Sequence, residues 1–150
     1  MKISILLPYK ENFSPIYAGA VSLFVKDTVT ISKLKKYIIV YGNTNLKKIY
    51  KLSYVNIFLK KKLIESGSKN YVNQFLKHER EAPSDIIEIH NRPNYFHMIE
   101  KKKNKQKIIL YFHNDPLTMT GSRSVSDRKR LLSNATKIIF NSHWSRKRFL

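Results

Sequence analysis

The chain has 150 residues, of which 29 are Lys or Arg and 10 are Asp or Glu, so its net charge at pH 7 is +19. It contains no cysteine, which excludes disulfide bonds and cysteine metal ligands and fits a reducing compartment. Its apolar content of 42% suits one globular domain, and no apolar run approaches the roughly 18 residues that a membrane span needs. We therefore expect a cytoplasmic protein that is either soluble or bound at a membrane surface.

The large positive charge has three explanations: a compositional bias toward lysine, an anionic membrane surface as partner, or nucleic acid as partner. Lys far outnumbers Arg, whereas specific phosphate and nucleic-acid sites favour Arg for its paired hydrogen bonds. Compositional bias and a membrane surface therefore stand ahead of nucleic acid, which we do not expect as a partner.

The first half of the chain begins with a predicted strand at 2–7, which Pro8 ends. The helix after it begins either at Ser14-Pro15, a good cap followed by proline, or near Gly19. Apolar residues at helical spacing give this helix a broad stripe that we expect to face the sheet: Val21, Leu23, Phe24, Val25, Val29, Ile31 and Leu34. Strands are then predicted at 37–41 and, more weakly, at 52–59.

The second half alternates helices with strands. Helices are predicted at 69–81, with Tyr71, Val72, Phe75 and Leu76 inward, and from Pro93, from Ser126 or Asp127, and from His143. Strands are predicted at 85–89, 108–112 and 136–140. The alternation predicts an α/β fold: one domain at 1–150 with a doubly wound, mostly parallel, six-stranded Rossmann-like sheet in the order 3-2-1-4-5-6.

Two of the predicted strands end in the same pair of residues, since His90-Asn91 follows one and His113-Asn114 follows another. Ligands bind at the carboxyl edge of open parallel sheets, so both pairs are candidates for a binding site. A neutral imidazole donates one hydrogen bond and accepts another. His113 can therefore be a ligand-binding residue, a general base or a structural histidine, and we expect Asn114 and Asp115 to shape the turn beside it.

Gly19 lies near the start of the first helix, where free backbone N–H groups favour a phosphate, although this glycine can equally serve only close packing on the sheet. The sequence lacks GxGxxG and has no clear acidic residue at the end of the second strand, which disfavours a nicotinamide dinucleotide. It also lacks HExxH, DxD, GxSxG and Walker motifs, so we expect no metal, no serine nucleophile and no P-loop.

The order of several segments resembles the N-terminal domain of GT-B glycosyltransferases, the retaining group called family 4. These segments are the first strand at 2–7, the small residues Ala18-Gly19-Ala20, and the ranges 85–91, 110–115 and 135–142. The resemblance covers essentially the whole chain. It implies that this domain recognises a glycan or lipid-linked acceptor, while a second Rossmann-like domain binds the nucleotide-sugar donor, with no metal or other cofactor. Because that donor domain is not within these 150 residues, we expect the chain alone to be inactive.

The resemblance also implies roles for single residues. Gly19 and Ala20 match the glycine loop that approaches the donor diphosphate, with Ala18 standing where the family usually has a second glycine. His113 matches the histidine that contacts the transferred sugar, and it is the catalytic candidate. The substrate-binding candidates beside it are His90, Asn91, Asn114 and Ser142.

Retention of configuration is expected from the family and from the absence of an obvious base near Gly19. Related enzymes with lipid-linked acceptors commonly sit on anionic membranes, so we expect peripheral association with the inner face of a membrane. Lysines at 47, 48, 51, 60, 61 and 62 are predicted to surround one side of the sheet. The alternative functions are a non-catalytic basic binding module, for a membrane surface or nucleic acid, and a receiver-like module, for which Pro8-Tyr9-Lys10 offers no acidic pocket.

Overall fold

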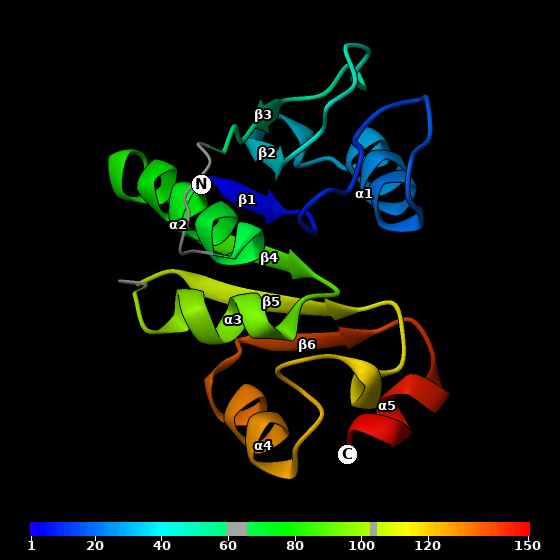
Figure 1. Ribbon diagram of the computed structural model, residues 1–150, viewed down its shortest axis with the longest axis vertical. Coiled ribbons are helices and arrows are strands. Elements are labelled where there is room, and N and C mark those ends of the chain that lie inside the picture. The colour runs from blue at the N-terminus through cyan, green and yellow to red at the C-terminus, as the bar shows by residue number, and fades with distance from the viewer. Residues whose placement is uncertain (60–65, 103–104) are drawn as a thin grey trace.

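The computed structural model describes residues 1–59, 66–102 and 105–150, which form one parallel sheet flanked by helices (Figure 1). The strands are β1 (Ile3–Leu6), β2 (Ile38–Gly42), β3 (Tyr54–Asn56), β4 (Ile86–His90), β5 (Lys107–Phe112) and β6 (Lys137–Phe140). Their order is β3-β2-β1-β4-β5-β6, and every neighbouring pair is parallel. The predicted fold class and strand order are confirmed.

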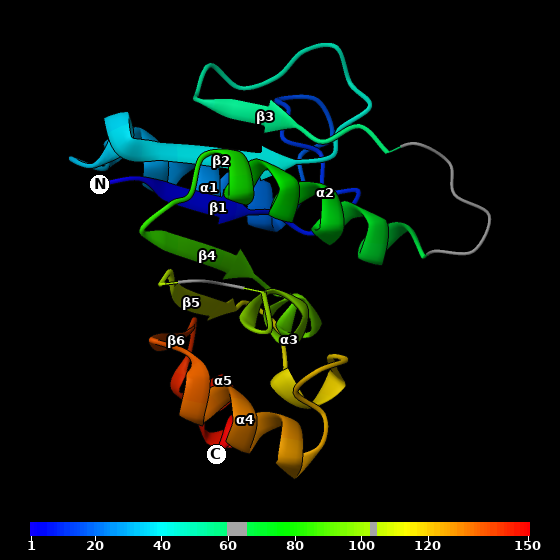
Figure 2. The same cartoon turned by 90° about the vertical axis from the view of Figure 1, so that its left-hand side faces the viewer.

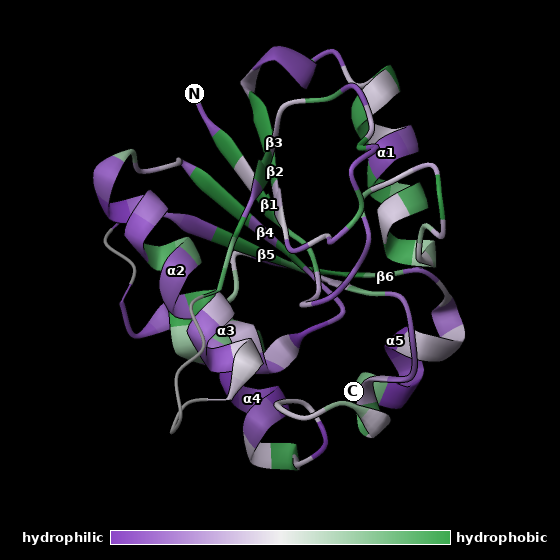
Figure 3. Ribbon diagram, turned by 45° about the horizontal axis from the view of Figure 1, so that its top comes forward, coloured by the Kyte–Doolittle hydropathy of each residue, from purple (hydrophilic) through white to green (hydrophobic). Residues whose placement is uncertain are grey.

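The helices are α1 (Ala20–Ile31), α2 (Gly67–Glu81), α3 (Pro93–Glu100), α4 (Val125–Asn134) and α5 (His143–Phe149), with short 3₁₀ turns η1 (Lys35–Tyr37) and η2 (Pro116–Thr118). They cover both faces of the sheet, with α1 on the side away from α2 and α3 (Figure 2). Hydrophobic residues follow the strands, whereas hydrophilic residues dominate much of the helical surface (Figure 3).

The sheet separates two hydrophobic cores, because successive side chains of a strand point to opposite faces. Ile3 and Ile5 of β1 join the core beneath α1, and Leu6 joins the core beneath α2 and α3. The predicted inward residues of α2 are all buried there: Tyr71, Val72, Phe75 and Leu76. Burying a side chain of this size stabilises the fold by about 1.5–3 kcal/mol.

Helix α1 begins at Ala20, after Gly19, so the alternative start at Ser14-Pro15 is wrong. The reason is local, because Ser14 Oγ accepts a hydrogen bond of 3.1 Å from the backbone N–H of Ile16 and closes a turn instead of capping a helix. The predicted apolar stripe was too broad. Val21, Val25 and Val29 are buried, but Leu23 is 45% and Ile31 84% exposed.

Most strand boundaries differ from the predictions by one residue at an end, and three further elements differ for identifiable local reasons. Strand β3 has 3 residues instead of the predicted run at 52–59, because it is an edge strand that pairs only with β2. Helix α4 starts at Val125, since the Ser124 side chain caps it by accepting from Asp127 N. Helix α2 starts two residues early, at Gly67, because Ser66 caps it in the same way.

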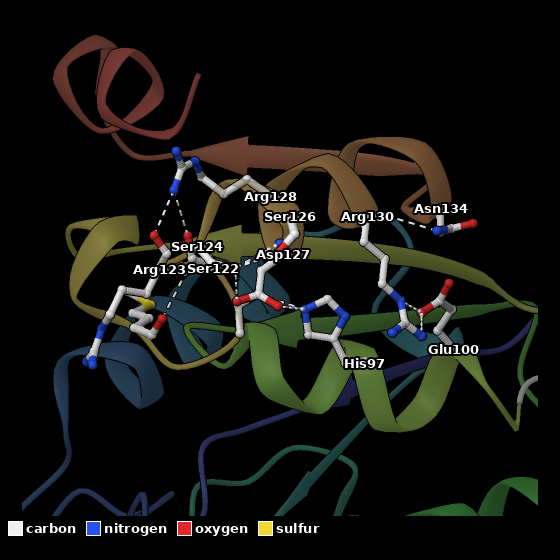
Figure 4. A network of polar contacts seen from close by, with 12 residues as sticks. His97, Glu100, Ser122, Arg123, Ser124, Ser126, Asp127, Arg128, Arg130 and Asn134 are labelled. Atoms are coloured by element: carbon white, nitrogen blue, oxygen red, sulfur yellow. Dashed lines mark hydrogen bonds and ion pairs between the residues drawn. The ribbon is translucent and has the colours of Figure 1, made fainter.

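A polar network ties the segment after β5 to α3 and α4 (Figure 4). His97 Nε2 donates to the carbonyl oxygen of Gly121 over 2.8 Å, and Arg130 forms an ion pair of 2.8 Å with Glu100. Gly121 has a φ of +92°, and a Cβ there would lie 2.5 Å from Asn94 N, so the turn requires glycine. The network anchors the loop that leaves the carboxyl end of β5.

Candidate functional site

The carboxyl ends of β4 and β5 bring the two predicted histidines together. In the register of these strands His90 lies opposite Tyr111, two residues before His113. His90 Nδ1 lies 2.9 Å from His113 Nε2, which is hydrogen-bonding distance. His90 is fully buried, and His113 is partly exposed at the edge of the sheet.

A carboxylate extends this pair to a chain of three side chains. Glu88 precedes His90 by two residues on the same strand, so both side chains point to the same face. Glu88 Oε1 lies 2.6 Å from His90 Nε2, and the Glu88 side chain is 22% exposed. The buried His90 therefore contacts Glu88 through one ring nitrogen and His113 through the other.

Aromatic rings enclose the histidine pair. The ring of Tyr111 stacks on His90 with centroids 5.0 Å apart, and it lies 5.5 Å from the ring of His113. Phe24, one turn into α1, meets His113 edge-on with centroids 4.9 Å apart. These contacts place an apolar wall beside the polar nitrogens, a combination that is typical of small-molecule sites.

The surroundings favour the neutral form of His113. Burial lowers its pKa from 6.5 to about 4; the neighbouring His90 adds to the decrease and the negative charge of Glu88 opposes it. Burial also raises the pKa of Tyr111, and the charge of Glu88 adds to that increase. At neutral pH His113 is thus an uncharged hydrogen-bonding group and a weak base.

Asparagines shape the backbone around His113. Asn91, which is buried and has a φ of +55°, accepts hydrogen bonds of 3.3 Å from the backbone N–H groups of both His113 and Asn114. Asn141 Nδ2 donates to the His113 carbonyl oxygen over 2.7 Å. Asn91 therefore has a positioning role, and substrate contacts by Asn91 and Asn114 stay predictions.

Asp115 shapes the next turn, as predicted. Its side chain accepts from Leu117 N over 3.0 Å, and it forms an ion pair of 2.9 Å with Arg148. The hydrogen bond from Arg148 lowers the pKa of the Asp115 carboxyl, and the bond from Leu117 N adds to the effect.

Gly19 and Ala20 lie at the N-terminus of α1, where they were predicted to approach a diphosphate. The carboxylate of Glu11 occupies part of this position, because its Oε1 accepts a hydrogen bond of 3.1 Å from Ser22 N. A Cβ on residue 19 would lie 2.0 Å from Glu11 Oε1, so a larger residue there would require the Glu11 side chain to shift. The expectation that no base lies near Gly19 is wrong, since the Glu11 carboxylate contacts it.

Ser142 is exposed and caps α5 by accepting from Ser145 N over 3.1 Å. It borders an open depression of about 520 Å³, together with Lys137, Ile139, Asn141 and Arg146. Asn141, which holds the His113 carbonyl, connects this depression with the histidine pair. A substrate contact by Ser142 stays a prediction.

Within the described ranges, no group of three or more His, Asp or Glu side chains is arranged to hold a metal ion. No helix in the same part of the chain is sufficiently long and apolar to span a bilayer.

The same fold occurs in sucrose-phosphate synthase from Thermosynechococcus elongatus, with a TM-score of 0.63 over 98% of this chain and 10% sequence identity. The chain has a GT-B glycosyltransferase-like fold. It spans 44% of the length of that synthase. At this identity the likeness concerns the fold and not the donor, the acceptor or the stereochemistry. No protein-family model and no curated protein sequence matches the chain.

Five contributors to the site were not predicted: Phe24 and Tyr111 as walls, Glu88 as a partner of His90, Asn141 as a donor to the His113 carbonyl, and Glu11 over the first turn of α1. A signal for Glu88 was present, because Glu88 and His90, like Tyr111 and His113, are spaced by two residues and so share one face of the sheet. Glu11 comes from an irregular loop, for which sequence periodicity gives no signal.

Proposed function

We propose that the chain supplies the acceptor-side wall of a glycosyltransferase active site, which transfers a sugar from a nucleotide-sugar donor to a glycan or lipid-linked acceptor. The main supporting observation is the gathering of the His90–His113 pair and Phe24 at the carboxyl edge of a sheet with a GT-B-like fold. A second Rossmann-like domain binds most of the donor in this proposal, so the 150 residues alone give no useful turnover.

In the proposed reaction His113 orients the transferred sugar. The uncharged ring hydrogen-bonds to a sugar hydroxyl, while Phe24 and Tyr111 offer apolar surface to the C–H groups of the sugar. The low pKa of His113 makes it a weak base, which agrees with a retaining mechanism that needs no general base on this domain. Retention and independence of metal ions are part of the proposal and rest on the family resemblance.

The test is an assay of the complete gene product with a panel of UDP-, GDP-, ADP- and dTDP-sugars and mixed glycan and lipid acceptors. At least one donor should release its nucleoside diphosphate in an acceptor-dependent way, with EDTA having no effect. The anomeric configuration of the product reports retention or inversion. A folded gene product that consumes none of the donors would exclude the proposal.

A second candidate function, binding to an anionic membrane surface, is favoured by a cluster of four lysines. Lys33, Lys35, Lys36 and Lys51 line an open depression of about 670 Å³ near the end of α1 and η1. Among the described residues none of these four lysines forms an ion pair. Ile31, 84% exposed, and Leu34, 42% exposed, lie in the same stretch of chain.

Exposed apolar side chains among these lysines fit the interface of a bilayer better than they fit nucleic acid, which offers no apolar interior. We therefore include in the proposal a peripheral location on the cytoplasmic face of a membrane. Of the lysines predicted to surround one side of the sheet, Lys47, Lys48 and Lys51 are exposed, as contact with a membrane surface requires. The lysines at 60–62 lie outside the described residues. A salt-sensitive gel shift with arbitrary DNA or RNA, without vesicle binding, would favour nucleic acid instead.

A further inference from the structure

The three side chains at the site form a chain in which the direction of each hydrogen bond is set by the one before it. Glu88 as a carboxylate only accepts hydrogen bonds, and its Oε1 is 2.6 Å from His90 Nε2. The proton of His90 must then lie on Nε2. In neutral His90 this leaves Nδ1 as an acceptor, because a neutral imidazole carries one ring proton.

His113 is the next member of the chain. Since His90 Nδ1 accepts, the 2.9 Å contact to His113 Nε2 requires the proton of His113 to lie on Nε2. The second nitrogen of His113, Nδ1, then carries a lone pair and no hydrogen. Among residues 1–59, 66–102 and 105–150 no side chain or backbone group bonds to this nitrogen, and His113 is partly exposed at the edge of the sheet.

We propose that Glu88 and His90 are positioning residues that hold His113 in its Nε2–H tautomer, so that Nδ1 accepts a hydrogen bond from a hydroxyl group of the bound sugar. The proposal rests on the proposed function for the identity of the ligand, but the direction of the hydrogen bonds does not depend on it. It gives the site a preference for hydroxyl groups, which donate, over ionised phosphate oxygens, which only accept.

The alternative arrangement places a charged His90 in the middle of the chain. Its Nδ1–H would then donate to His113 Nε2, and His113 would present an N–H to the ligand instead of a lone pair. His90 is fully buried, with the rings of Tyr111 and His113 both within 5.2 Å of its own and the Glu88 carboxylate 2.6 Å from its Nε2. The two arrangements put the proton on different nitrogens of His113, so a measurement of the tautomers decides between them.

The test is the tautomeric state of the histidines in the ¹⁵N-labelled chain at pH 7.5, measured from the ¹⁵N shifts of the ring nitrogens. We expect His90 and His113 both to be protonated on Nε2 alone. A His113 protonated on Nδ1, or a His90 protonated on both nitrogens, would overturn the proposal without any variant being made.

Glu88→Leu removes the acceptor that starts the chain, so His113 should become a mixture of its two tautomers. Glu100→Leu is the control, because Glu100 is also a partly buried carboxylate but pairs with Arg130 away from the histidines. A His113 that stays entirely in the Nε2–H form in Glu88→Leu, or that changes equally in Glu100→Leu, would also contradict the proposal.

The two proposals can fail separately. If the tautomers are as expected but the complete gene product consumes no nucleotide sugar, the hydrogen-bond chain stands and the proposed function fails. If sugar is transferred but His113 presents an N–H to the ligand, the proposed function stands and the proposed directions of the hydrogen bonds are wrong. In an active enzyme Glu88→Leu should lower kcat about tenfold, the effect of one hydrogen bond of roughly 1.4 kcal/mol, and Glu100→Leu should leave kcat unchanged.

Discussion

Glu11 Oε1 accepts a hydrogen bond of 3.1 Å from Ser22 N, which places a carboxylate over the first turn of α1. Free N–H groups at the start of a helix attract anions, and here an anion from the chain itself already contacts them. A donor diphosphate that approached Gly19 would meet this negative charge. Glu11 must therefore move aside, or weaken diphosphate binding, if Gly19 has its predicted role.

Replacing Glu11 by Gln keeps an oxygen that can accept from Ser22 N but removes the negative charge. We expect Glu11→Gln to bind pyrophosphate several-fold more tightly than the unchanged chain, as one fewer like charge faces the anion. Backbone amide shifts of Val21 and Ser22 during a pyrophosphate titration at low salt measure this. Asp27→Asn removes the same charge from an exposed position of α1 and is the control. Equal affinity of Glu11→Gln and the unchanged chain for pyrophosphate would contradict the prediction that a diphosphate binds at this end of α1.

The pKa of His113 predicts a pH dependence of stability. Its folded-state pKa, about 4, lies below its ordinary value of 6.5, so the unfolded chain binds more protons between these values. The contribution of His113 to stability is therefore complete above pH 6.5 and is lost as the pH falls toward 4. Urea unfolding at pH 7.5 and pH 5 should show a smaller loss of stability on acidification for His113→Asn than for the unchanged chain.

The exposed His143 provides the matched control for that experiment. His143→Asn should lose as much stability on acidification as the unchanged chain does. If His113→Asn also behaves like the unchanged chain, His113 is not buried in its neutral form.

Glu79 is a buried carboxylate that fastens α2 to β1. Its Oε1 accepts from Ser4 Oγ over 2.6 Å, and its Oε2 accepts from Ser84 N and Ser84 Oγ over 3.0 and 2.7 Å. Glu79→Ala leaves these buried donors without a partner and should lower the free energy of unfolding by about 2–4 kcal/mol. Glu81→Ala, at an exposed position of the same helix, should change it by less than about 0.5 kcal/mol. Equal urea midpoints for the two variants would contradict this role.

The cluster of Lys33, Lys35, Lys36 and Lys51 predicts a charge-dependent interaction with membranes. Sedimentation should recover the chain with vesicles that contain phosphatidylglycerol, and much less of it with pure phosphatidylcholine or at high salt. Lys35→Glu/Lys36→Glu should weaken this binding at least tenfold, since each lysine near the surface contributes about 1 kcal/mol. Lys77→Glu/Lys129→Glu changes the net charge equally, on α2 and α4, and should have a smaller effect. Equal effects of the two pairs of substitutions would indicate that the total charge of the protein, and not this lysine cluster, governs membrane binding.

The architecture was predictable from the sequence because its signals are local and repeated. The runs at 108–112 and 136–140, for example, are short, apolar and ended by turn formers, and the alternation of such runs with amphipathic helices allows few topologies. The start of α1 could not be fixed from the sequence, because Ser14 and Gly19 are both acceptable caps. Only the turn that Ser14 makes with Ile16 decides between them.

The position of the site could be predicted from the sequence, but the contacts among its side chains could not. His90 and His113 could be placed at one edge of the sheet from the strand pattern, but their contact depends on the β4–β5 register. The enclosure by Phe24 depends on where α1 crosses that edge. The position of Glu11 depends on a loop with positive φ at Lys10 and Tyr17, which has no periodic pattern to reveal it.

The most direct test of the account compares His113→Ala with His97→Ala in the complete gene product, using whichever nucleotide sugar and acceptor it accepts. His113 faces the proposed sugar site, whereas His97 bonds to the Gly121 carbonyl in the network beside α4. We expect His113→Ala to lower kcat at least tenfold with a melting temperature within a few degrees of the unchanged protein, and His97→Ala to lower stability but leave kcat unchanged in the folded fraction. Unchanged turnover in a folded His113→Ala protein would contradict the placement of the active site at the carboxyl edge of β5.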